Sequence, residues 1–153
     1  MKQRGWCHGF YAVRPLFFTG IFMKYIILTN NPLAKKEFES THDVEFVDGK
    51  LMDVLVRARD MVNSGAVLLS HPLYGSVKPN ETPFRSILIK KAEASAAGEF
   101  PAADPESVRL IGNAISAFNK FIVKKEVADP SVLEDFQVVD LSLLRSAVQS
   151  ADR

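Results

Sequence analysis

The sequence has a single cysteine, Cys7, among its 153 residues. One thiol cannot form an internal disulfide, and it cannot supply the ligands of a cysteine-based metal cluster. The three histidines, His8, His42 and His71, stand far apart, with no second metal ligand at helical or turn spacing. We therefore expect no bound metal. The lack of disulfides is consistent with a reducing, cytoplasmic location, which we also expect.

Long apolar runs and an excess of charge are also missing. No segment reaches the roughly 20 apolar residues that cross a bilayer. Nineteen basic and eighteen acidic side chains give a net charge of +1, and no basic run resembles a phosphate-backbone footprint. We expect neither a membrane nor a nucleic acid as a partner, while the oligomeric state is left open.

Glycine is absent where a dinucleotide would need it. Asp48 ends the second predicted strand about 19 residues after the first turn, the place of a ribose-binding acid in dinucleotide folds. The turn itself, "TNNPLAKKE", has no glycine of the G-x-G-x-x-G pattern, so a pyrophosphate could not approach its backbone in that way. We predict no nicotinamide cofactor, and no other pattern indicates a cofactor.

The N-terminal residues differ from the rest of the chain. Residues 1–22 begin with basic residues, but Arg14 and Pro15 interrupt their apolar character and no cleavage site follows, so they do not form an export signal. From Met23 the sequence "MKYIILTNNP", a basic residue followed by an apolar run, has the form of a natural translation start. We predict that residues 1–22 are an extension, disordered or the product of an over-called start codon, and that residues 23–153 form one domain.

The apolar pattern of residues 23–153 alternates between strands and helices. It predicts strands at Tyr25–Leu28, Asp43–Val47, Ala66–Leu69 and Ser86–Ile89. It predicts helices over Leu33–Ser40, over Leu51–Val62, from Asp104 with a core face of Val108, Ile111, Ile115, Phe118 and Ile122, and near Leu141–Val148. Phe136–Val139 fits either a strand or part of the last helix.

This alternation predicts an α/β fold, and continuous apolar strands indicate a sheet covered on both faces. We predict a three-layer, Rossmann-like or flavodoxin-like open sheet, mostly parallel, of about four to five strands, with strand one between strands two and three. The loop of about 14 residues before the fourth strand contains no helix, and it permits either direction for that strand.

In such a sheet the loops after strands one and three leave the same edge, where ligands of open α/β sheets bind. "TNNP" and "HPLYGSVKPNETP" would form the two walls of a crevice, and Pro72, Pro79 and Pro83 would stiffen the second wall. The predicted ligand-binding residues are Thr29, Asn30, Asn31, His71, Gly75, Ser76, Lys78, Asn80 and Thr82.

The residue types in this crevice favour a small anionic ligand. Lys78 would supply charge, and Ser76 with the backbone amides near Gly75 would donate hydrogen bonds to a carboxylate or phosphate. Asn30 or Asn31 would orient the ligand. The alternative for Asn80, Glu81 and Thr82 is that they bond the loop's own backbone, as short polar side chains in turns do.

An enzymatic alternative rests on His71, because imidazole titrates near neutral pH. With Glu81 as its partner, His71 would act as acid and base on a carbonyl or phosphoryl substrate. The structural alternative is that His71 bonds to backbone at the end of a strand. Ser76 and Lys78 make half of a serine/lysine arrangement, but nothing completes it. We therefore assign no catalytic residue.

Three segments carry a family resemblance: "MKYIILTNNPL", "VEFVDGKLMDVLVRARDMV" and "LLSHPLYGSVKPNETPFRSILI". They resemble the GrdX family of small proteins associated with glycine, sarcosine and betaine reductase systems of anaerobic bacteria. The resemblance covers Met23 to Lys90 strongly and the C-terminal helices loosely. It implies an accessory role beside a selenium-dependent amino-acid reductase, with reductase components as partners and a cytoplasmic location, and it carries over no catalytic residues.

Overall fold

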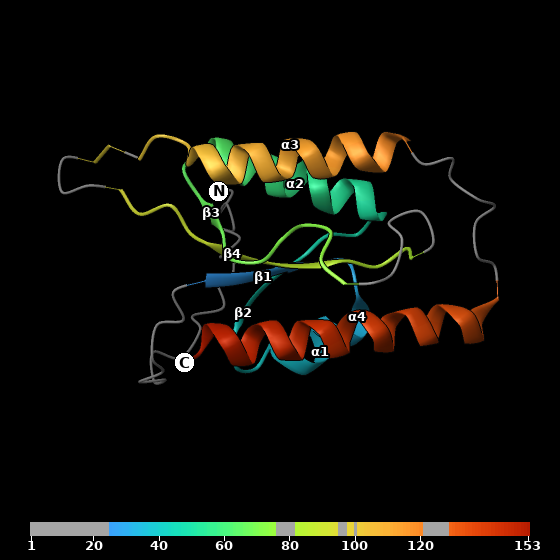
Figure 1. Cartoon of the computed structure of the whole chain (residues 1–153). Coiled ribbons are helices and arrows are strands. Elements are labelled where there is room, and N and C mark those ends of the chain that lie inside the picture. The colour runs from blue at the N-terminus through green and yellow to red at the C-terminus, as the bar shows by residue number, and fades with distance from the viewer. Residues whose placement is uncertain (1–24, 76–81, 95–97, 100, 121–128) are drawn as a thin grey trace, which may run out of the picture.

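The computed structural model describes residues 25–75, 82–94, 98–99, 101–120 and 129–153. The elements in these ranges follow the order β1 (Tyr25–Thr29), α1 (Pro32–Phe38), β2 (Asp43–Phe46), α2 (Leu51–Asn63), β3 (Val67–Leu68), β4 (Ser86–Lys90), α3 (Pro105–Lys120) and α4 (Pro130–Ala151). They form three layers, with the sheet between α2 and α3 on one side and α1 and α4 on the other (Figure 1). The predicted extension, residues 1–22, lies outside the described residues.

The sheet is mixed, so the predicted mostly parallel, Rossmann-like sheet is wrong. Its strand order is β2-β1-β4-β3. β1 pairs with β2 in parallel, whereas β4 runs antiparallel to both β1 and β3 and separates them. The described residues between β3 and β4, 69–75 and 82–85, contain no crossover helix of the kind that usually joins parallel strands, and β4 pairs antiparallel with β3 as the second arm of a wide hairpin. The fold is therefore α/β in composition, but its sheet is not doubly wound.

Alternation along β1 and β4 divides the core between the two faces. Ile26 and Leu28 of β1 pack with Ile87 and Ile89 of β4 against α2 and α3. Ile27 lies on the other face, under α1 and α4. All five side chains are at most 3% exposed. Burial of each aliphatic side chain of this size contributes roughly 1.5–3 kcal/mol, so both helical layers are held mainly by these two strands.

Helix α3 packs through smaller residues than its sequence predicts. Val108, expected in the core, is 40% exposed, while Ser107, Ile111 and Ala114 are buried. The Ser107 hydroxyl accepts a hydrogen bond from the Leu68 backbone N–H at 3.0 Å. This bond satisfies a donor at the short edge strand β3 and turns the helix so that Ser107, not Val108, faces the sheet.

Helix α4 is longer than predicted and includes Phe136–Val139, which settles the choice left open by the sequence in favour of a helix. The Asp129 carboxylate caps it by accepting from the Ser131 N–H, and Pro130 occupies its first turn. Among the described residues, no helix is long and apolar enough to cross a membrane.

Candidate functional site

Asn30 joins three segments at the edge of the sheet where β1 ends. Its side-chain N–H₂ group donates to the Gly49 and Pro83 carbonyl oxygens, each at 2.9 Å. Its Oδ1 accepts from the Arg85 N–H at 2.8 Å. The turn after β1 is thereby tied to the turn after β2 and to the segment that enters β4.

Asp140 of α4 is the centre of a buried polar network at the same edge. The residue is 4% exposed. Its Oδ1 accepts from the Ser86 N–H at 3.0 Å, and its Oδ2 accepts from the Ser86 hydroxyl at 2.7 Å and from Asn31 Nδ2 at 2.9 Å. The Thr29 hydroxyl lies 2.8 Å from that of Ser86 and accepts from the Asn31 N–H. The helix, β1 and β4 are fixed together by one carboxylate.

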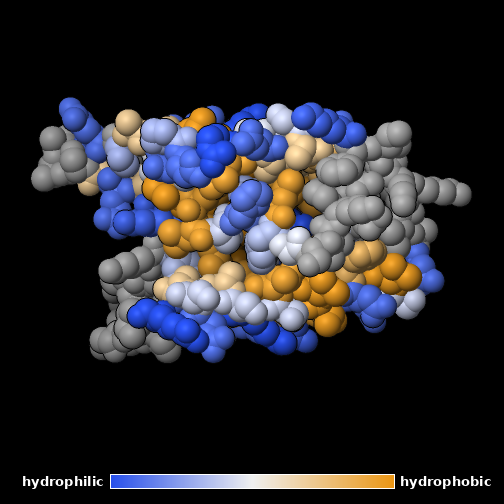
Figure 2. All heavy atoms as spheres, viewed as in Figure 1, coloured by the Kyte–Doolittle hydropathy of each residue, from blue (hydrophilic) through white to orange (hydrophobic). Residues whose placement is uncertain are grey.

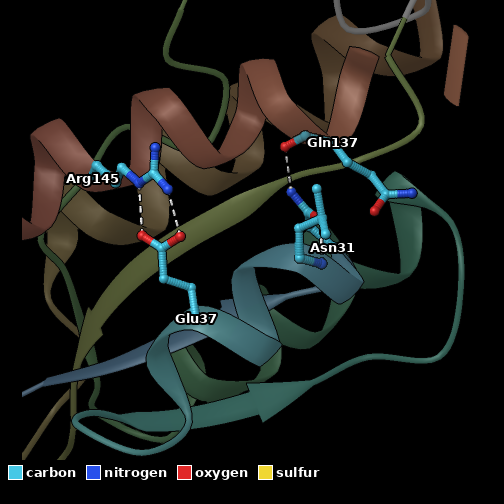
Figure 3. Close-up of polar contacts among 5 residues, drawn as sticks. Asn31, Glu37, Gln137 and Arg145 are labelled. Carbon is cyan, nitrogen blue, oxygen red and sulfur yellow. Dashed lines mark hydrogen bonds and ion pairs between the residues drawn. The ribbon is translucent and has the colours of Figure 1, made fainter. Parts of the chain in front are cut away.

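Asn31 is also bonded to both α1 and α4. Its Oδ1 caps α1 by accepting from the Leu33 N–H, and its Nδ2 donates to the Gln137 carbonyl oxygen at 2.9 Å (Figure 3). In the same view the Arg145 guanidinium of α4 pairs with both carboxylate oxygens of Glu37 of α1. The side chains of Asn30 and Asn31 are thus engaged with the protein itself, and their predicted contact with a ligand stays a prediction.

His71 opens a tight turn after β3. Its Nδ1 accepts from the Leu73 N–H at 3.1 Å, and its carbonyl oxygen accepts from the Tyr74 N–H. A neutral ring in this geometry carries its proton on Nε2. The residue is exposed. His71 is therefore bonded to backbone through Nδ1, which agrees with the alternative in which it is a structural histidine at the end of a strand.

Gly75 brings this turn against α4. Its φ is +100°, in the left-handed region that glycine favours, and a Cβ at this position would lie 2.7 Å from Leu143 Cδ1. Gly75 therefore packs closely against α4. Four other predicted residues, Ser76, Lys78, Asn80 and Glu81, lie outside the described residues, and with them the His71–Glu81 and Ser76–Lys78 pairs.

Thr82 is buried, and its hydroxyl bonds only to nearby backbone among the described residues. It accepts from the Phe84 N–H at 3.4 Å and lies 3.3 Å from the Phe84 carbonyl oxygen. The alternative in which Thr82 bonds the loop's own backbone is therefore supported. In the described ranges, no group of three or more His, Cys, Asp or Glu side chains is placed to hold a metal ion.

The sequence pattern did not identify Arg85, which lies at the centre of this edge. Arg85 is 2% exposed, and its Nη1 donates to the Tyr74 carbonyl oxygen at 2.6 Å. The guanidinium carbon lies 5.7 Å from the centroid of the Tyr74 ring, within cation–π range. Its Nε is buried and has no hydrogen-bond partner in the described part of the chain. Burial lowers the pKa of Arg85, and the negative charge of Asp140 opposes that shift.

Arginine remains charged in proteins even when its pKa is lowered. Arg85 and Asp140 attract each other through space, but no ion pair joins them among the described residues. The edge therefore contains a buried cation with an unused N–H donor, next to a carboxylate whose oxygens are already engaged.

Tyr74 shares this burial. Its hydroxyl is buried without a hydrogen-bond partner among the described residues, and burial raises its pKa. Because the folded state holds the phenolic proton to higher pH than the unfolded state, stability should fall as pH rises above about 10, the unfolded value.

We expect Tyr74→Phe to remove an unsatisfied hydroxyl and to stabilise the protein at pH 7 by about 1 kcal/mol. Urea unfolding from neutral to alkaline pH would measure this, and the variant should lose less stability above about pH 10 than wild type. Tyr25, whose pKa is raised by burial and by its hydrogen bond to Asp152, keeps its share of that loss. A Tyr74→Phe protein that is less stable at pH 7 would show that the hydroxyl is bonded.

An open cleft of about 550 Å³ lies at the opposite edge of the sheet, where β3 begins and β4 ends. Lys90, Lys91, Glu93 and Pro101 are among its lining residues. None of the described residues in the predicted ligand-binding set borders this cleft.

A protein-family model, GrdX-like protein, matches residues 26–149. The chain belongs to the GrdX family. The resemblance carried by its sequence segments is thereby confirmed, and the match spans the whole described edge, from Thr29 through Arg85 to Asp140. No curated protein and no solved structure matches this GrdX-family chain.

Proposed function

We propose that this GrdX-family chain is a non-catalytic accessory protein of glycine, sarcosine or betaine reductase metabolism that binds a small anionic ligand at the Arg85 edge. Membership of the family supports the metabolic setting. In that setting its partners would be reductase components in the cytoplasm. The chemistry of the edge supports the anion.

The observation that carries the proposal is the unused N–H donor of buried Arg85. A charged group in the interior is costly unless it is paired and hydrogen-bonded. A guanidinium presents several donors in a fixed plane that matches a carboxylate or phosphate, and such charge-assisted bonds are among the strongest in proteins. An anion beside Nε would supply the missing acceptor and balance the charge.

The predicted residues then divide into two roles. Asn30 and Asn31 position the edge, because their amide groups are bonded to the protein. Ser76 and Lys78 keep their predicted roles as further donors to the anion. In the enzymatic alternative His71 and Glu81 act on a carbonyl or phosphoryl substrate, but among the described residues the His71 ring bonds to the Leu73 backbone N–H and to no other group.

Thermal-shift and calorimetric titrations test this proposal. We expect at least one of acetate, glycine, betaine, acetyl phosphate and inorganic phosphate to raise Tm and to bind with measurable heat. Arg85→Lys keeps the charge but removes the planar donor set, so it should weaken binding about tenfold or more (~1.4 kcal/mol).

Arg109→Lys is the matched control, because Arg109 lies exposed on α3 and pairs with Glu106. It should bind like wild type. A wild-type protein that responds to no member of the panel, or an Arg85→Lys protein that folds and binds as tightly as wild type, would contradict the proposal.

A further inference from the structure

The first half of α4 carries an exposed apolar surface. Among the described residues six large apolar side chains are exposed, and three of them, Val132 (37%), Val138 (55%) and Val139 (42%), lie within eight residues of this helix. Phe136, half-buried, lies between them. Figure 2 shows apolar side chains gathered over this half of α4. We call Val132, Phe136 and Val139 the α4 patch.

The α4 patch follows the spacing of one helix face. Val132, Phe136 and Val139 stand at i, i+4 and i+7, which forms a ridge of the kind that packs into a groove of another helix. The stretch is about 12 Å long at the rise of an α-helix, which matches two turns of a partner helix.

The charged residues of α4 near the α4 patch are all acidic. Asp129, Glu134 and Asp135 are exposed at this end of the helix. Between residues 129 and 144 the helix has no lysine or arginine, and the first basic residue, Arg145, is already paired with Glu37. An apolar ridge with an acidic border is complementary to an apolar ridge with a basic border.

The helix is anchored directly behind the α4 patch. The Gln137 carbonyl oxygen and the Asp140 carboxylate both hold Asn31, and Asp140 also holds Ser86. The exposed valines therefore project from a turn that is fixed to the sheet, and not from a detached helix end.

We infer that the α4 patch is the docking surface for a basic amphipathic helix of a partner protein. Val132, Phe136 and Val139 would pack against the apolar face of that helix, and its lysine or arginine side chains would lie beside Asp129 and Asp135. A second copy of this chain is a poorer occupant, because two α4 patches face to face would bring their acidic borders together. The inference does not depend on the anion site.

Fluorescence anisotropy with a labelled four-turn peptide of leucine and lysine at amphipathic helical spacing tests the inference. We expect saturable binding that weakens at high salt. A peptide of the same composition in scrambled order, and a leucine/glutamate peptide at the amphipathic spacing, should each bind at least about tenfold more weakly.

Two surface variants address the two halves of the recognition. Val132→Glu with Val139→Glu removes the apolar ridge, and Asp135→Lys reverses the charge beside it; each should weaken binding about tenfold or more. Asp60→Lys, at an exposed position on α2, is the matched control for the charge reversal and should bind like wild type.

Far-UV circular dichroism checks that each variant is folded, and the changed positions are solvent-exposed. Equal binding of the scrambled peptide, or unchanged binding by both α4 variants, would overturn the inference. So would sedimentation that shows a wild-type dimer which Val132→Glu with Val139→Glu converts to a monomer, because the occupant would then be a second copy.

Discussion

Asp140→Ala is expected to lower the free energy of unfolding by about 3–5 kcal/mol, the largest effect of any single polar substitution considered. The change leaves the Ser86 N–H, the Ser86 hydroxyl and Asn31 Nδ2 without their shared acceptor in a buried site. Each unsatisfied buried donor costs about 1–3 kcal/mol. Buried Arg85 also loses the nearest opposite charge that acts on it. Urea unfolding at pH 7 measures the loss.

Asp135→Ala is the control for this measurement, since Asp135 lies exposed on the same helix. Its effect should stay within about 0.5 kcal/mol. If both substitutions change the midpoint equally, Asp140 is not the centre of the network that joins α4 to β1 and β4.

Asn30→Ala should lower the free energy of unfolding by about 2–3 kcal/mol. One side chain supplies all three bonds, to the Gly49 and Pro83 oxygens and from the Arg85 N–H, and alanine replaces none of them. The Arg85 N–H keeps no side-chain acceptor in the interior, and two segments lose their tie to β1. The same urea titration, compared with wild type, gives the value.

Asn113→Ala provides the comparison, because Asn113 is exposed in the middle of α3. Alanine has the higher helix propensity there, so this variant should be as stable as wild type or slightly more so. An Asn30→Ala protein that matches Asn113→Ala in stability would show that the three segments are held by other contacts.

Local patterns predicted the elements of this fold better than their arrangement. The stripe Leu51–Val62 became α2, and the apolar run at Tyr25 became β1, because each depends on nearby residues. The direction of β4 depends instead on the chain between β3 and β4, whose described residues, 69–75 and 82–85, form no helix that could carry it across the sheet. β4 returns as the arm of a hairpin and lies between β1 and β3. The prediction of a mostly parallel sheet was therefore wrong.

The predicted crevice and the described edge share Thr29, Asn30 and Asn31, but the central side chains of that edge, Arg85 and Asp140, were not predicted. A lone arginine before an apolar strand and a lone aspartate in an apolar helix usually face solvent. The sequence pattern therefore predicts exposed positions for Arg85 and Asp140. Both are buried because Asn31, Ser86 and Tyr74, distant in sequence, supply their partners. The available signal was a charge placed at an otherwise apolar position, as in "VVDLSLL".

The most direct measurement is the ¹H–¹⁵N resonance of Arg85 Nε, assigned by its disappearance in Arg85→Lys. The proposed function predicts that this resonance moves and saturates when acetate, glycine, betaine, acetyl phosphate or inorganic phosphate is titrated into the wild-type protein. A resonance that stays unchanged through the whole panel would contradict an anion site at Arg85.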